Sequence, residues 1–73
     1  MKKSAVIGLG LTGTSAIHYL QGQGEYVIAL DTREAPQGVD ALQQQYPDMP
    51  IHLGSLQPLL SEPVDRIVLS PGV

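Results

Sequence analysis

Short continuous apolar runs alternate along this chain with stretches in which apolar residues recur at helical spacing. Continuous runs, as opposed to strictly alternating ones, are typical of strands buried on both faces of a parallel sheet. They predict strands over residues 4–8, 26–30, 51–53 and 66–69. The helical spacing, together with the Gly and Pro residues that end it, predicts helices over 13–23 and 40–46 and a helical turn over 56–60.

This alternation of strands and helices predicts an α/β fold with parallel strand pairing. In a Rossmann-like, doubly wound arrangement, an open sheet of about four strands takes the order 3-2-1-4 and carries flanking helices. The first and fourth strands are then neighbours whose connections leave in opposite directions, which opens a crevice beyond their carboxyl ends. Because the chain stops at Val73, directly after the last strand, we expect a truncated domain, a fragment of a larger protein.

A glycine-rich segment, Gly8-Leu9-Gly10-Leu11-Thr12-Gly13, follows the first predicted strand. In a GxGxxG turn the first glycine permits a tight bend, the second lets an anion approach the backbone, and the third lets helix and strand pack closely. The free N–H groups of the first helical turn carry partial positive charge, so a diphosphate can bind there without a lysine. Asp31, at the end of the second apolar run, completes the order expected of a nucleotide-binding unit.

Three loops follow strand ends on the same predicted edge of the sheet, over residues 8–13, 31–33 and 70–72, and we expect them to converge. Structural interpretations remain open beside the functional one. Asp31 could be an ordinary turn acid, and Arg33 a surface side chain or the partner of Asp31 or Glu34. Thr12 could cap the first helix.

Composition narrows the function further. The chain has 73 residues, no cysteine and a formal net charge of −3, so it makes one small domain and lacks the basic, aromatic surface of a nucleic-acid binder. No segment approaches the roughly 18 apolar residues that cross a bilayer, which excludes a membrane partner and makes a cytoplasmic location the default.

We predict no catalytic residue and no metal site in this chain. His18 and His52 lack a second ligand at i+3 or i+4, and Ser70 lacks the setting of an exposed nucleophile. There is no GxxxxGK[ST] loop and no carboxylate cluster for magnesium, so these residues cannot perform an ATP-dependent step.

The glycine loop with its Leu11-Thr12 pair, the triplet Asp31-Thr32-Arg33 and the turn Ser70-Pro71-Gly72 together resemble the N-terminal domain of the bacterial Mur ligases. The likeness spans essentially the whole chain, residues 1–73. It implies a three-domain enzyme that uses ATP and magnesium to add D-glutamate to a UDP-linked peptidoglycan precursor. This chain would hold the UDP end, while the ATP-binding central and C-terminal domains, absent here, would act on it in cis; no cofactor is expected in the fragment itself.

The resemblance also implies which residues meet the ligand: Asp31 and Thr32 read the uracil, and Arg33 flanks it. Uracil offers one N–H donor between two carbonyl acceptors, which suits a carboxylate beside hydroxyl and backbone donors, and a guanidinium can stack on a planar base. The complete implied UDP-binding set is Gly10, Leu11, Thr12, Gly13, Asp31, Thr32, Arg33, Ser70 and Gly72.

Two alternatives of other classes remain open at this point. In an NAD-binding domain of an oxidoreductase, Asp31 would accept hydrogen bonds from an adenosine ribose. In a purely structural module, the glycine loop would serve packing alone and no nucleotide would bind.

Overall fold

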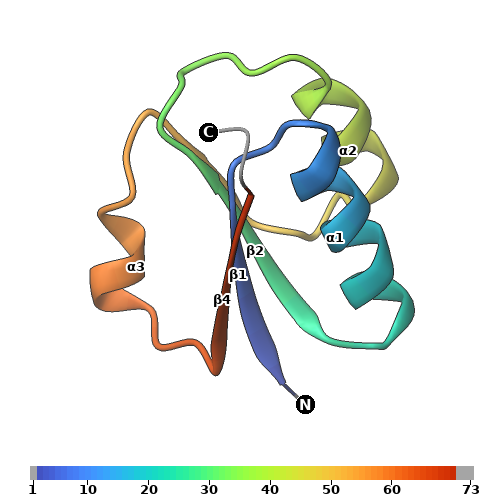
Figure 1. The fold of residues 1–73 in the computed structure, drawn as a ribbon, viewed down its shortest axis with the longest axis vertical. Coiled ribbons are helices and arrows are strands. Elements are labelled where there is room, and N and C mark those ends of the chain that lie inside the picture. Colours follow the sequence, from blue (N-terminus) through green and yellow to red (C-terminus); the bar gives the residue numbers. More distant parts are fainter. Residues whose placement is uncertain (1, 71–73) are drawn as a thin grey trace.

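The computed structural model of the chain describes residues 2–70 (Figure 1). Its strands are β1 (Lys3–Ile7), β2 (Tyr26–Asp31), β3 (Ile51–Leu53) and β4 (Arg66–Leu69). Its helices are α1 (Leu11–Gly22), α2 (Val39–Gln45) and α3 (Pro58–Ser61). Each predicted element is present, and its bounds lie within about two residues of those expected from the sequence.

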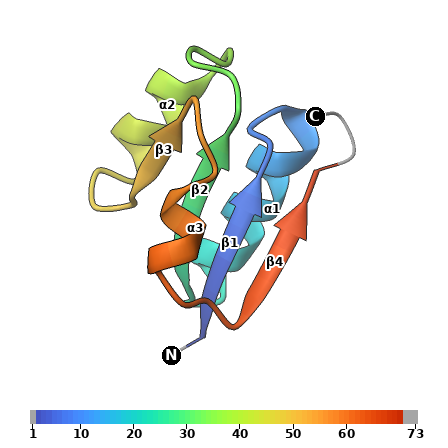
Figure 2. The same ribbon diagram turned by 90° about the vertical axis from the view of Figure 1, so that its left-hand side faces the viewer.

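The strands form one parallel sheet in the order β3-β2-β1-β4, which confirms the predicted α/β fold and strand order. Figure 2 shows the strands side by side and pointing the same way, so their carboxyl ends share one edge. Helices α1 and α2 cover one face of the sheet, and α3 lies on the other (Figures 1 and 2).

Each face of the sheet has its own apolar cluster, because successive side chains of a strand point to opposite faces. Val6 of β1 and Ala29 of β2 pack under the two larger helices, against buried residues that include Ile17, Leu20 and Leu42. Ala5, Ile7, Ile28 and Leu30 form the second cluster, covered by Leu56, Leu59 and Val64. The continuous apolar runs of β1 and β2 are therefore buried on both faces, as their pattern predicts.

Strand β4 behaves differently because it lies at an edge of the sheet. Its Val68 packs on the α1 side, whereas Ile67 and Leu69 are 56% and 67% exposed on the opposite face. The apolar run at 66–69 predicts the strand correctly, but it does not by itself distinguish an edge strand from a central one.

The turn from β1 into α1 is made by two glycines with separate roles. Gly8 has a φ of +97°, a left-handed conformation that other residues rarely adopt, and its N–H donates to the Leu30 carbonyl at 2.8 Å. A Cβ placed on Gly13 would lie 1.7 Å from the Gly8 oxygen, so only glycine lets α1 pack this closely on the turn. These are the bend and the close approach expected of the motif.

Helix α1 begins at Leu11, two residues earlier than predicted. Gly10 is the N-cap in an extended conformation, with φ −78° and ψ −166°, and no side chain caps the helix. Thr12 is therefore the second residue of the helix, and its alternative interpretation as a helix cap is wrong.

We predict that Gly13→Ala lowers the free energy of unfolding by about 3 kcal/mol or more, because the new methyl group collides with backbone. The matched control is Gly22→Ala in the same helix, where a Cβ meets no atom within 4 Å. Alanine there should be neutral or stabilise by up to about 1 kcal/mol. Urea unfolding followed by circular dichroism measures both, and equal stability of the two variants would contradict this account of the turn.

Candidate functional site

Parts of the three predicted loops meet at the carboxyl edge of the sheet. The Leu9 N–H donates to Asp31 Oδ2 at 2.8 Å and thereby joins the glycine loop to the end of β2. The Ser70 N–H donates to the Ile7 carbonyl at 2.9 Å, and the Ser70 Cβ lies 3.6 Å from where a Cβ on Gly13 would stand. Ser70 therefore borders the glycine loop, whereas Gly72 lies outside the described residues.

The Asp31 carboxylate is buried and fully engaged by donors from its own chain. Its residue is 0% exposed. Oδ2 accepts the Leu9 N–H at 2.8 Å and Arg33 Nη2 at 2.7 Å, while Oδ1 accepts the Arg33 N–H at 2.8 Å and Arg33 Nε at 3.0 Å. A carboxylate offers about four acceptor positions, and all of them are taken by these four bonds.

This environment lowers the pKa of the Asp31 carboxyl far below its ordinary value. The hydrogen bonds from the Arg33 guanidinium are the largest cause, and those from the Leu9 and Arg33 N–H groups act in the same direction against the effect of burial. Asp31 is therefore ionised at neutral pH, and its carboxylate connects Leu9 to Arg33.

The Asp31 carboxylate ties Leu9 to Arg33, and its predicted contact with uracil stays a prediction. Of the interpretations left open for Arg33, partnership with Asp31 is the one that the structure has. The Arg33 side chain nevertheless remains 53% exposed, so one side of it stays accessible.

The start of α1 presents the other polar feature of the site. Within residues 2–70, no acceptor is bonded to the N–H groups of Leu11, Thr12 and Gly13, and the first turn contains no acidic side chain. These groups carry the positive end of the helix dipole. A Cβ on Gly10 would meet no atom within 4 Å, so the backbone at the N-cap is open to approach. The arrangement suits an anion such as a phosphate.

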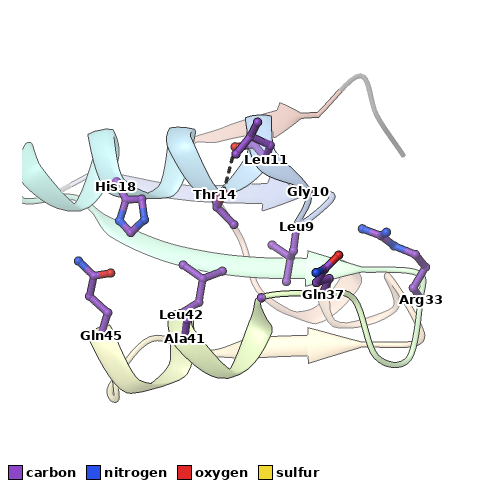
Figure 3. Close-up of a pocket in the computed structure, with 11 residues that line it drawn as sticks. Leu9, Gly10, Leu11, Thr14, His18, Arg33, Gln37, Ala41, Leu42 and Gln45 are labelled. Carbon is purple, nitrogen blue, oxygen red and sulfur yellow. Dashed lines mark hydrogen bonds between the residues drawn. The ribbon is translucent and has the colours of Figure 1, made fainter.

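A groove of about 440 Å³ runs from this helix start between α1 and α2 (Figure 3). Arg33 and Gln37 lie at one end, next to the glycine loop, and His18 and Gln45 lie at the other (Figure 3). Its lining consists of Leu9, Gly10, Leu11, Thr14, His18, Arg33, Gln37, Gly38, Ala41, Leu42 and Gln45. The volume is within the usual range for small-molecule sites.

The groove includes only part of the residue set predicted from the sequence. It shares Gly10, Leu11 and Arg33 with that set, whereas Thr12, Gly13, Asp31, Thr32 and Ser70 do not line it. Thr12 and Thr32 are exposed beside it on the same edge. The contribution of α2 and of the loop before it was missed, because no motif marks Gln45 or Gln37 and only the packing of this segment beside α1 brings them to the groove.

The two histidines lie on different elements of the fold. His18 is exposed on α1, and its Nδ1 lies 2.6 Å from the hydroxyl of Tyr46, the residue that follows α2. His52 lies in β3, the edge strand. Among residues 2–70, no group of three His, Cys, Asp or Glu side chains could hold a metal ion.

Positive side chains are distributed unequally between the amino and carboxyl ends of the strands. Lys2 and Lys3 lie at the start of β1, and Arg66 at the start of β4 pairs with Glu25. Of the four lysines and arginines in the chain, only Arg33 lies at the carboxyl edge. None of the described helices is long and apolar enough to span a bilayer.

We predict that Asp31→Asn destabilises the chain by about 1–3 kcal/mol at neutral pH, because an amide cannot accept all four donors. The folded pKa of Asp31 lies below the unfolded value of about 3.9, so its stabilisation is complete above that value and is lost as the pH falls below it. The difference in free energy of unfolding between wild type and variant should therefore decrease as the pH falls from about 5 to about 2.

Urea unfolding at a series of pH values measures this gap. Glu25, whose pKa is lowered chiefly by its bond to Arg66, contributes equally to both proteins and cancels in the comparison. Glu25→Gln is the control and should leave the Asp31 effect intact. A gap that does not change with pH would mean that the charge of Asp31 is not what stabilises the site.

Comparison with known proteins gives an independent view of this site. Residues 2–73 match the family model described as Mur ligase MurD-like, N-terminal domain. The chain is 47% identical over 68 residues to the UDP-N-acetylmuramoylalanine--D-glutamate ligase of Alcanivorax borkumensis, covering 93% of this chain and 15% of that protein. It is 43% identical over 72 residues to the ligase of the same name from Methylobacillus flagellatus, covering 99% of this chain and 16% of that protein.

The ligase of the same name from Marinobacter nauticus is 38% identical over 72 residues, again 99% of this chain and 16% of that protein. The chain therefore spans about a sixth of the length of the curated relatives that it matches. The family match covers nearly the whole chain, in agreement with the resemblance in its glycine loop, its Asp-Thr-Arg triplet and its Ser-Pro-Gly turn. The chain belongs to the MurD-like N-terminal domain family of the Mur ligases.

Proposed function

We propose that this chain binds the UDP end of UDP-N-acetylmuramoyl-L-alanine for a ligase that adds D-glutamate in peptidoglycan precursor synthesis. The names of the relatives specify a UDP-linked substrate and D-glutamate. The observation that carries the proposal is the start of α1, where an open Gly10 backbone and N–H groups without bonded acceptors in residues 2–70 offer a diphosphate site. The proposal keeps the cytoplasmic location expected from the sequence.

In this proposal the diphosphate is held by main chain. The N–H groups of Leu11, Thr12 and Gly13 donate to its oxygens, and the exposed Thr12 hydroxyl adds a donor. Because lysines lie at the opposite edge, the helix dipole and Arg33 supply the positive potential. The helix N–H groups donate in directions fixed by the backbone, whereas a lysine would supply a point charge on a flexible side chain.

The uridine then extends from the diphosphate toward the loop after β2. Leu11 is 87% exposed and offers an apolar surface beside the groove. Thr32 and Arg33 follow β2 directly, and the accessible side of the guanidinium can stack on the base. Asp31 acts indirectly, by holding Leu9 and Arg33 in place. Ser70 forms the wall next to Gly13, and Gly72, outside the described residues, belongs to the set only through the resemblance.

The residues present do not fit an ATP–magnesium site. The chain has no phosphate-loop lysine, and its described part has no acidic cluster. We therefore assign ATP, magnesium and the ligation step to other domains of the ligase, acting in cis on the precursor held here. This chain by itself is proposed to bind and not to catalyse.

The alternative of an NAD-binding oxidoreductase domain has no support in the comparisons, since the matched relatives are ligases. It would also require the Asp31 carboxylate to accept ribose hydroxyls, although its four acceptor positions are already taken. A purely structural module remains the competing interpretation, and it predicts no response to nucleotide.

We expect UDP to bind weakly, at up to millimolar concentration, and to shift the backbone amide NMR signals of Gly10 to Gly13. Signals from Gln23 and Gly24, at the opposite end of α1, serve as the internal control and should stay in place. The same titration with NAD should give smaller changes. Absence of amide shifts in the glycine loop at millimolar UDP would refute the proposed function.

The Gly10→Ala variant tests UDP binding separately from the stability of the fold. A methyl group at Gly10 meets no protein atom within 4 Å, and the extended backbone there suits alanine, so stability should change by less than about 1 kcal/mol. Affinity for UDP should fall about tenfold or more, because the methyl group stands where the diphosphate approaches the backbone. Gly22→Ala, which is equally unhindered but at the other end of α1, should bind as wild type. A structural module predicts no difference between the two variants.

A further inference from the structure

Burial of apolar side chains does not explain the register of β4 against β1. Val68 packs on the α1 side of the sheet, whereas Ile67 and Leu69 are exposed on the opposite face. Because side chains alternate along a strand, a shift of β4 by one residue would turn Ile67 and Leu69 toward α1 and Val68 away from it. That shift would place two larger apolar side chains under α1 in place of one. Another interaction therefore holds β4 in its observed register.

Three polar side chains, Ser4, Glu25 and Arg66, join the start of β4 to the rest of the sheet, and we call them the register cluster. Arg66 lies directly opposite Ser4 of β1, so the two side chains share one face of the sheet. The buried Ser4 hydroxyl donates to Glu25 Oε1 at 2.6 Å and accepts Arg66 Nε at 3.2 Å. Arg66 Nη2 also bonds Glu25 Oε2. The cluster thus connects β1, the residue before β2 and β4.

The register cluster forms in only one register. A shift by one residue would turn Arg66 to the opposite face of the sheet, away from Ser4 and Glu25. The Glu25 side chain is only 13% exposed, and a carboxylate with so little access to water is strongly disfavoured without its cation. Asp65 also bonds Lys3 of β1 at this end, but its partners are backbone N–H and C=O groups. Because such groups recur along β1, they do not select a register.

The other end of β4 leads directly to the candidate site. Ser70 follows Leu69, its N–H donates to the Ile7 carbonyl at 2.9 Å, and it borders Gly13 of the glycine loop. A shift by one residue would move this segment along the strand by about 3.3 Å, which is the rise per residue of a parallel strand. The register of β4 therefore decides whether Ser70 lies against the glycine loop.

We propose that Arg66 is a positioning residue: its bonds to Glu25 and Ser4 fix the register of β4 and thereby place Ser70 beside the glycine loop. Arg66 lies at the start of the strand and Ser70 just after its end, so Arg66 acts on the site through β4 (Figure 2). The consequence for ligand binding rests on the proposed function, whereas the register itself is a property of the fold.

Methyl NMR of the Arg66→Ala variant tests the register without any ligand. In wild type, the Val68 methyl groups should show nuclear Overhauser contacts to the apolar cluster under α1, and those of Ile67 and Leu69 should show none. In Arg66→Ala, Ile67 and Leu69 should gain these contacts and Val68 should lose them. If Arg66 only added stability, the variant would unfold more easily but keep the wild-type contacts.

Titration with UDP, followed by the amide signals of residues 10–13, measures the effect at the site. Arg66→Ala should weaken UDP binding by about fivefold, because Ser70 no longer borders the glycine loop. The double variant Glu25→Arg with Arg66→Glu rebuilds the ion pair with its charges exchanged. It should restore both the wild-type methyl contacts and the wild-type affinity.

Lys2→Ala is the matched control, because it removes a positive charge at the same end of the sheet from a residue outside the register cluster. It should keep the methyl contacts and the UDP affinity of wild type. The proposal is overturned if folded Arg66→Ala retains the wild-type contacts of Val68. Should Arg66→Ala not fold, the charge-exchanged variant decides: wild-type contacts support the proposal, and shifted contacts or failure to fold overturn it. A wild-type chain that ignores UDP removes the proposed function but leaves the methyl test of the register intact.

Discussion

The conformation of the loops at the carboxyl edge of this sheet depends on one buried anion, the Asp31 carboxylate. Asp31 ends β2, and its carboxylate reaches across 22 positions of sequence to hold the N–H of Leu9 in the glycine loop. An ionised carboxylate without exposure is tolerated only when donors replace water, and the Leu9 N–H and the backbone and side chain of Arg33 supply them. The shape of the glycine loop and the position of Arg33 are therefore set by the same group.

In the proposed function, this use of Asp31 leaves diphosphate binding to main-chain N–H groups. The first turn of α1 keeps its N–H groups because Gly10 caps the helix without a side chain, and close packing of Gly13 on Gly8 holds the helix start at the strand end. Positive side chains are gathered at the opposite edge, where Arg66 bonds Glu25 and Ser4. A site built in this way relies on dipoles and shape more than on net charge.

Family membership and geometry answer different questions about this chain. The match to the Mur ligase domain covers residues 2–73 and identifies the kind of protein from which such a domain comes. In the proposed function the diphosphate lies at the start of α1 and the base extends toward the loop after β2, while Asp31 holds Leu9 and Arg33 in place. The chain spans only about a sixth of the length of these relatives.

The sequence alone determined the strands, their order and the roles of Gly8 and Gly13, because periodicity and backbone sterics are local properties that few residues specify. The tertiary structure decided which way Asp31 faces, that α2 and Gln37 border the groove, and that Ile67 and Leu69 of β4 are exposed. These features depend on which segments become neighbours. The donors that surround a carboxylate depend on the register of its strand with the neighbouring strands. An apolar side chain is buried only if another element packs over it.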